Sequence, residues 1–137
     1  MLYVVIDTNV IVSALLAIDN QYSIPLSIVS AVFTGKIIPI LSPDILDEYR
    51  DVLAREKFGF DQRKIEVFLS ELKTQSVFVN PPKTRHSLPD PKDVCFYEAA
   101  LVYEKVGGLL VTGNTKHYPN CPFSVTPTQL KERLSLL

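Results

Sequence analysis

The sequence predicts an α/β fold in which helices cover both faces of a central parallel sheet. Short apolar runs, typical of strands buried on both faces, alternate along the chain with longer segments of helical periodicity. The first run, residues 2–6, ends at the polar triplet Asp7, Thr8 and Asn9. Ligands bind just outside the carboxyl ends of strands in open parallel sheets. We therefore expect Asp7 to lie at a binding site, beside the positive end of the following helix.

The composition is that of an ordered globular protein. The chain has 137 residues, of which 47% are hydrophobic, and shows no internal repeat, low-complexity tract or linker. We expect a single domain over residues 1–137 that buries roughly two thirds of its unfolded surface without a disulfide or structural metal. The formal net charge of −1 disfavours a broad basic surface for nucleic acid, but not an enzyme that contacts a few phosphates.

Membrane, export and cysteine signals are weak. No apolar run approaches the ~20 residues of a membrane-spanning helix, and no export signal is recognisable, so we expect a cytoplasmic protein without membrane contact. Cys95 and Cys121 lack the spacing of a metal site and are expected to be free thiols.

The first forty residues predict two strands and two helices. After the strand over residues 2–6, a helix is expected over residues 9–16, and Thr8 or Asn9 can act as its N-cap. A second helix is expected over residues 25–34, with Gly35 as its left-handed C-cap. Residues 36–41 have the composition of a strand, although Pro39 lacks the N–H that a sheet interior requires.

Ser42 and Pro43 predict the start of a helix that runs to about residue 55, because serine caps helices and proline suits the first helical position. Its apolar stripe consists of Ile45, Leu46, Tyr49, Val52 and Leu53. Glu48 falls inside this stripe, whereas Asp47 falls on the outer face. An inward Glu48 is either a functional carboxylate or a partner in a structural ion pair.

The rest of the chain continues the alternation. Asp61 caps a helix to about residue 73, and a largely apolar, buried helix is expected over residues 94–103. Short strands are expected over residues 76–79, 109–111 and 122–125, and Thr126 starts a final helix with Leu130, Leu134 and Leu137 on one face. The proline-rich residues 80–92, with Lys83, Arg85 and His86, form either a solvated connector or a basic rim that contacts phosphates.

Asp90 and Asp93 precede the helix over residues 94–103. Acids at a helix start can serve only as caps and partners of the helix dipole, so this spacing alone does not establish a functional role.

Four stretches together resemble the motifs of PIN domains, the nuclease fold of many toxins of toxin–antitoxin pairs. They are Asp7-Thr8-Asn9, the helix after Ser42-Pro43 with its Glu48, Asp93 three residues before Phe96, and Thr112-Gly113-Asn114. Asp90 is an additional acid of the Asp-Pro-x-Asp branch, and Asn114 stands where Thr-x-Asp is common. The resemblance covers essentially the whole chain and implies a three-layer α/β/α fold with strand order 3-2-1-4-5.

Under this resemblance, Asp7, Glu48, Asp90 and Asp93 meet at one edge of the sheet. Two unit charges about 5 Å apart repel by ~3 kcal/mol at an effective dielectric constant of about 20, so some acids protonate or a cation lies among them. Carboxylates in a chain with few His or Cys residues suit Mg²⁺ or Mn²⁺, which can activate water and stabilise the leaving oxygen of a phosphodiester. His86 and His117 are too far apart in the sequence to indicate a zinc site.

We therefore expect a Mg²⁺- or Mn²⁺-dependent endoribonuclease. Asp7, Glu48 and Asp93 are the candidate catalytic residues and metal ligands, assisted by Asp90. Candidates for supporting hydrogen bonds are Thr8, Asn9, Thr112 and Asn114, and candidates for RNA contacts are Arg85, His86 and Lys116. Because Asn114 adds no negative charge, weaker ion binding is expected than in a Thr-x-Asp relative. RNA as substrate, a small antitoxin as partner and self-association into a homodimer are implied by the resemblance alone.

Two alternatives remain open. A phosphatase of the haloacid dehalogenase type also begins with a strand and an Asp, but it needs a second Asp where this chain has Asn9. A catalytically weak RNA-binding module is compatible with the missing acid at position 114. A phosphatase turns over small phosphate esters, and a binding module turns over neither these nor RNA.

Overall fold

A five-stranded parallel sheet forms the centre of the computed structural model, which describes residues 1–84 and 87–136. The strands are β1 (Leu2–Ile6), β2 (Ile37–Leu41), β3 (Val77–Phe78), β4 (Leu109–Val111) and β5 (Ser124–Val125). They lie in the order β3-β2-β1-β4-β5, and every pairing between neighbours is parallel. The predicted fold class and strand order are confirmed.

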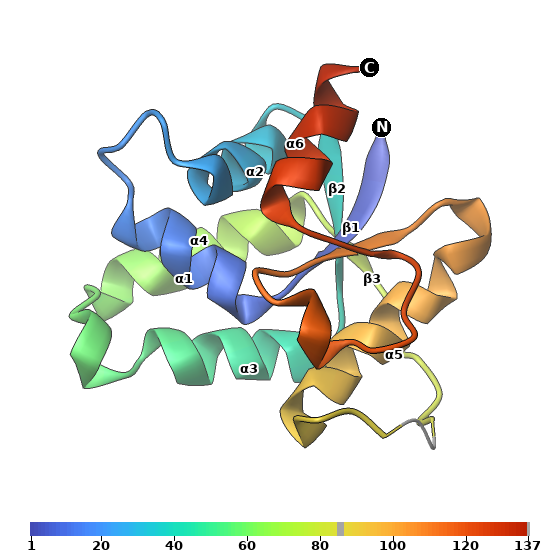
Figure 1. Ribbon diagram of the computed structural model, residues 1–137. Helices are drawn as coiled ribbons and strands as arrows, with labels where there is room; N and C mark the ends of the chain where they lie inside the picture. Colours follow the sequence, from blue (N-terminus) through green and yellow to red (C-terminus); the bar gives the residue numbers. More distant parts are fainter. Residues whose placement is uncertain (85–86, 137) are drawn as a thin grey trace.

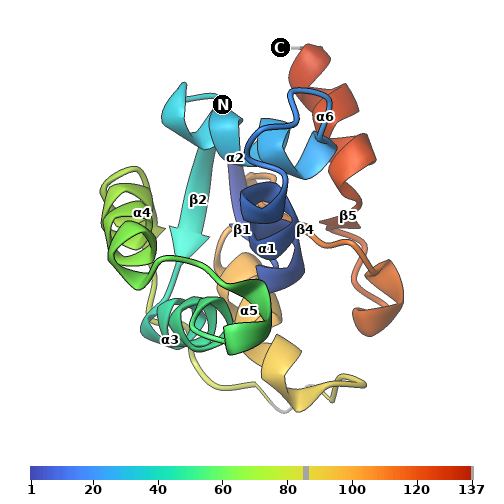
Figure 2. The same ribbon diagram turned by 90° about the vertical axis from the view of Figure 1, so that its left-hand side faces the viewer.

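Helices cover both faces of this sheet, with α1 and α2 on one side of β1 and α5 on the other (Figures 1 and 2). The helices are α1 (Thr8–Leu16), α2 (Ile24–Phe33), α3 (Pro43–Leu53), α4 (Gln62–Thr74), α5 (Val94–Val102) and α6 (Pro127–Ser135). Short 3₁₀ turns are η1 (Glu56–Phe58), η2 (Pro91–Asp93), η3 (Glu104–Val106) and η4 (Thr115–His117). None of the helices in the described part of the chain is both long and apolar enough to span a bilayer.

Most helix starts follow local capping chemistry. The Ser42 hydroxyl accepts a hydrogen bond from the Ile45 amide at 3.2 Å, and the Asp61 carboxylate accepts one from the Arg63 amide at 2.9 Å. Gly35 adopts a positive φ of 79° after α2, as the sequence predicts. Leu130 is buried on the inner face of α6, whereas Leu137, predicted on the same face, lies outside the described residues.

The predicted N-cap of α1 is wrong. The capping position is Asp7, which has extended backbone angles and forms no side-chain capping bond. Asn9 is unsuited to the role because its amide oxygen accepts a hydrogen bond from the Gly113 amide at 3.2 Å. The Thr8 hydroxyl is buried without a hydrogen-bond partner in the described structure. Tertiary contacts therefore override the local capping preference at this strand end.

Pro39 lies within β2 despite its missing donor. It is buried and in register with Val4 of β1. On the other side of β2, the pairing with β3 involves only Ile40 and Leu41. Pro39 thus precedes the stretch where β3 lies alongside, so the paired β3 segment requires no donor from it. The strand prediction is confirmed, and the conflict is resolved by the shortness of β3.

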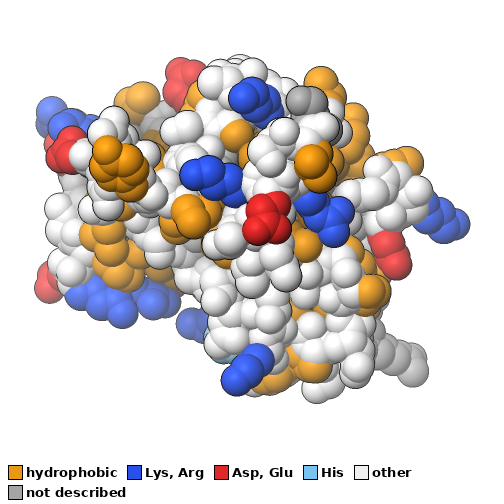
Figure 3. All heavy atoms as spheres, turned by 45° about the horizontal axis from the view of Figure 1, so that its top comes forward, with side chains coloured by type: hydrophobic (Ala, Val, Ile, Leu, Met, Phe, Trp, Pro, Cys, Tyr) orange, Lys and Arg blue, Asp and Glu red, His pale blue; other side chains and the backbone are white. Residues whose placement is uncertain are grey.

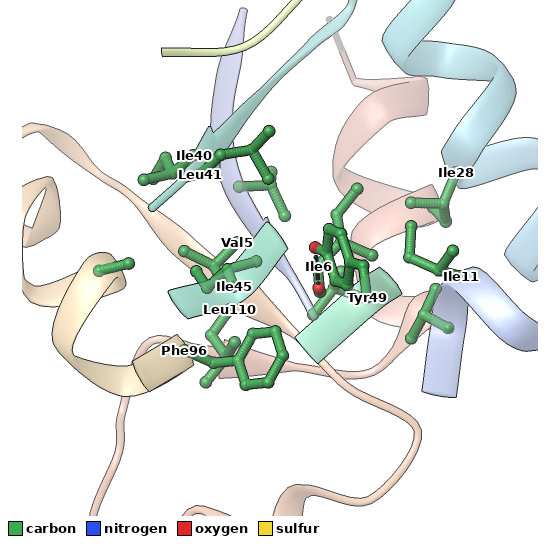
Figure 4. Packing of buried hydrophobic residues seen from close by; sticks show 14 of the residues in the cluster. Val5, Ile6, Ile11, Ile28, Ile40, Leu41, Ile45, Tyr49, Phe96 and Leu110 are labelled. Carbon is green, nitrogen blue, oxygen red and sulfur yellow. Dashed lines mark hydrogen bonds between the residues drawn. The ribbon is translucent and has the colours of Figure 1, made fainter. Parts of the chain in front are cut away.

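The core joins α3 and α5 to the central strand close to the end of β1. The predicted stripe of α3 is buried as a whole, and Tyr49 and Phe96 lie with ring centroids 6.1 Å apart. The Tyr49 hydroxyl donates a hydrogen bond to the Ile6 carbonyl (Figure 4). Packing and hydrogen bonding thereby hold the strand residue that directly precedes Asp7.

Candidate functional site

The carboxyl edge of the sheet opens into a cleft of about 400 Å³. Four acids line it: Asp7 after β1, Glu48 in α3, and Asp90 and Asp93 in the turn before α5. These segments meet below the end of β1 in the view of Figure 1. The structure thus brings all four predicted acids into one cleft, together with Thr8 and Asn9.

Asp7 is the most firmly held of these acids. Its side chain is only 5% exposed, and its Oδ2 accepts hydrogen bonds from the Thr112 hydroxyl at 2.7 Å and the Tyr118 hydroxyl at 3.2 Å. Burial raises the pKa of Asp7 above its ordinary value, and these two hydrogen bonds partly oppose that rise. The negative charge of Asp7 is therefore oriented but incompletely compensated.

Asp93 is the second buried acid, with 8% exposure. Its Oδ2 has no hydrogen-bond partner in the described structure, although His117 Nδ1 lies 3.4 Å away, within ion-pair distance. Burial, followed by repulsion from Asp7 and then Asp90, raises the pKa of Asp93 to about 6, and His117 acts in the opposite direction. Mutual repulsion of this kind is relieved by a cation among the carboxylates.

Glu48 and Asp90 form the more exposed part of the acid cluster. Glu48 is partly buried and lines the cleft, whereas its neighbour Asp47 is exposed on the outer face of α3. Asp90 also has a local structural role, because its Oδ1 accepts a hydrogen bond from the Lys92 amide at 3.0 Å and caps η2. The capping interpretation of this acid is therefore correct, and it coexists with a position in the cleft.

The loop after β4 contacts the acids of the cleft through hydrogen bonds to Asp7. Thr112 is fully buried; its hydroxyl donates to Asp7 and accepts from the Asn114 amide at 3.1 Å. Asn114 is exposed, is not among the cleft-lining residues, and caps η4 by accepting from the Lys116 amide at 3.1 Å. Thr112 therefore contacts an acid directly, whereas the Asn114 side chain faces its own turn.

The basic side chains that line the cleft are those of Arg55, Lys92 and His117. The predicted RNA contacts lie elsewhere: Lys116 is exposed but does not line the cleft, and Arg85 and His86 lie outside the described residues. Lys83 of the same proline-rich segment pairs with Asp44 at 2.7 Å.

On the face shown in Figure 3, Lys and Arg side chains gather at the lower left, and the other basic side chains drawn there are separated by neutral and hydrophobic ones. Most of the basic side chains on this face are therefore dispersed, in agreement with the formal net charge of −1.

Sequence reasoning missed Tyr118 and His117, which contact Asp7 and Asp93 from the end of one short turn. A signal was available. The strand order places β4 beside β1, so residues that follow β4 share the sheet edge with Asp7. Hydrophobic periodicity does not predict where side chains six and seven residues beyond the strand will lie.

The donor set fits a hard divalent cation. The candidate ligands are carboxylates, two of them buried with raised pKa, and Asp93 Oδ2 lacks a hydrogen-bond donor. Over the described ranges, no three His, Cys, Asp or Glu side chains stand close enough to form a metal cage in these conformations. Ion binding by three or more of these acids would therefore require side-chain movement.

Comparison with known proteins identifies the family. Residues 3–116 match the PIN domain. The chain is similar to the uncharacterized protein MJ1680 of Methanocaldococcus jannaschii, with 33% identity over 115 residues that cover 81% of this chain and 70% of that protein. No solved structure matches significantly. The match, which includes all four acids of the cleft, shows that the chain belongs to the PIN-domain family.

Proposed function

We propose that this protein is a Mg²⁺- or Mn²⁺-dependent endoribonuclease whose residues 1–137 act as one domain. One observation carries the proposal: two buried carboxylates, Asp7 and Asp93, both with a raised pKa, share a cleft that two further acids line, and the charge of Asp7 contributes to the raised pKa of Asp93. PIN domains typically use divalent metals, which agrees with this donor set.

The chain's own residues divide into ligands and supports. Asp7, Glu48 and Asp93 would hold the ion, with Asp90 assisting. Thr112 orients Asp7 through a 2.7 Å hydrogen bond. When bound, Mg²⁺ or Mn²⁺ supplies Lewis-acid stabilisation of the phosphodiester and lowers the pKa of water.

The cleft also supports a nucleic-acid substrate with unpaired bases. Phe58 of η1 lines the cleft and stacks on Phe60, with ring centroids 5.8 Å apart and planes inclined by 23°. Lys57 Nζ lies 5.1 Å from the Phe58 ring centroid, and Arg55 lines the cleft nearby in the chain. An aromatic ring beside cations suits a stacked base and its phosphate. RNA rather than DNA is proposed on the family resemblance alone.

The same resemblance supports the biological setting that we propose. The protein would be the toxin of a toxin–antitoxin pair, inhibited by a small antitoxin protein that blocks the acidic cleft. Self-association into a homodimer is part of this proposal. Co-expression with the product of an adjacent small open reading frame, followed by binding and inhibition measurements, tests the pairing.

Cleavage of defined RNAs by the purified protein tests the activity. We expect products with Mg²⁺ or Mn²⁺, none with a chelator, and none from Asp93→Asn, whereas Asp47→Asn serves as the matched control on the outer face of α3. RNA binding without cleavage would identify a binding module instead. Turnover of small phosphate esters without RNA cleavage would identify a phosphatase.

A further inference from the structure

Tyr118 connects the turn after β4 to the first acid of the cleft. It is 2% exposed and follows directly after η4. Its hydroxyl donates to Oδ2 of Asp7 at 3.2 Å, and the Thr112 hydroxyl donates to the same oxygen at 2.7 Å. Two hydroxyl groups from one loop thus converge on a single carboxylate oxygen.

The other oxygen of Asp7, Oδ1, receives neither of these two hydrogen bonds. Across residues 1–84 and 87–136, both hydroxyl donors are on Oδ2 and no side-chain donor reaches Asp7 Oδ1; the carboxylate otherwise interacts with the backbone amides of Thr8 and Asn9, and Asp7 lines the cleft. A tyrosine hydroxyl is protonated at neutral pH, so the Tyr118 phenol is a hydrogen-bond donor to Asp7.

We propose that Tyr118, together with Thr112, restrains Asp7 so that the carboxylate offers one oxygen, Oδ1, to a divalent cation, and thereby selects small octahedral ions over Ca²⁺. The proposal rests on the proposed metal-binding role of Asp7. Mg²⁺ demands near-octahedral coordination, whereas Ca²⁺ accepts more ligands and bidentate carboxylates. A carboxylate that cannot rotate to present both oxygens favours the smaller ion. Tyr118 is thus a positioning residue that acts through Asp7.

The test is the ratio of Mn²⁺ to Ca²⁺ affinity in Tyr118→Phe, measured by calorimetric titration of the full chain. We expect Mn²⁺ binding to weaken about fivefold, which corresponds to about 1 kcal/mol lost from a hydrogen bond to a charged group. Ca²⁺ binding should stay unchanged or tighten. Tyr49→Phe is the matched control, because it removes a hydroxyl of similar burial that donates to the Ile6 carbonyl instead of the carboxylate. It should lower the melting temperature and leave the ratio unchanged.

Thr112→Val is the second variant and decides the question if Tyr118→Phe does not fold. It should shift the ratio of Mn²⁺ to Ca²⁺ affinity in the same direction. The separate variant Thr112→Ser, which keeps a hydroxyl, should have the wild-type ratio. A wild-type ratio in every folded variant that lacks one of the two donors overturns the proposal. Asp7→Asn separates this failure from failure of the proposed function. If Asp7→Asn leaves Mn²⁺ binding intact, Asp7 is no ligand; if it abolishes binding while the ratio in Tyr118→Phe stays wild-type, only the selection by Tyr118 is rejected.

Discussion

The hydroxyl of Thr112 donates to Oδ2 of Asp7 at 2.7 Å, although the two residues are 105 positions apart in the chain. The bond crosses from the end of β4 to the end of β1, two strands that pair directly in the sheet. It is therefore both a link between strands and a constraint on the candidate metal ligand.

Replacing Thr112 by Val should lower the free energy of unfolding by about 1.5–3 kcal/mol. Valine has nearly the same shape as threonine but lacks the hydroxyl that donates to the buried Asp7 carboxylate. Urea unfolding at neutral pH without added metal measures the change. Thr112→Ser is the control and should retain most of the stability. Equal stability of the Val variant and the wild type would show that Tyr118 alone satisfies Asp7.

Asp7→Asn should abolish RNA cleavage, by at least about 100-fold, while the protein stays folded. The metal-free variant should also melt a few degrees higher, because Asn removes a charge whose burial raises the pKa of Asp7 and still accepts hydrogen bonds from Thr112 and Tyr118. Cleavage assays and thermal unfolding in chelator check both effects. Cleavage near the wild-type rate would remove Asp7 from the proposed site.

Glu48→Gln should reduce cleavage far more than Asp47→Asn. The two residues are neighbours in α3, but only Glu48 lines the cleft, and Asp47 is exposed. Initial rates at saturating Mn²⁺ compare them, with the melting temperatures of both variants as the folding control. Similar losses in both would mean that the electrostatic field of the helix matters and the position of Glu48 does not.

The sequence-based predictions were accurate where the interactions are local in the chain and failed where they join residues far apart in it. The direction of Glu48 was predictable because helical periodicity is local, and Asp7 because a buried strand ends at an acid. Tyr118 and the N-cap of α1 were not, since both depend on the loop after β4 crossing to Asp7 and Asn9. A long-range contact of this kind competes with local capping preference and is invisible to it.

The metal-free protein should lose stability as the pH rises from about 4 to about 7. The pKa of Asp93 is raised from 3.8 to about 6, so between these values the native state binds more protons than the unfolded state. The free energy of unfolding then falls with increasing pH. Asp7, whose pKa is also raised, contributes in the same direction.

The shift of Asp93 sets an upper limit of about 3 kcal/mol, and solvent screening in an open cleft reduces the expected effect to on the order of 1 kcal/mol. Denaturant unfolding in chelator at several pH values measures it. Asp93→Asn should flatten this part of the profile, and saturating Mn²⁺ should reverse the slope. A variant profile that parallels the wild type would assign the pH dependence to other groups.

Asn114→Asp distinguishes charge counting from geometry. If position 114 contributed to the ion, an added carboxylate should tighten Mn²⁺ binding about fivefold, equivalent to roughly 1 kcal/mol. The structure predicts less, because the Asn114 side chain caps η4 through the Lys116 amide and is not among the residues that line the cleft. Asp is an equally good cap, so the turn that carries His117 and Tyr118 should persist.

We therefore expect the Mn²⁺ dissociation constant to change by less than about twofold at matched ionic strength, since an exposed charge is largely screened. Calorimetric titration of both proteins decides between the two values, and a fivefold gain would show that the turn moves its side chain into the cleft when the ion binds.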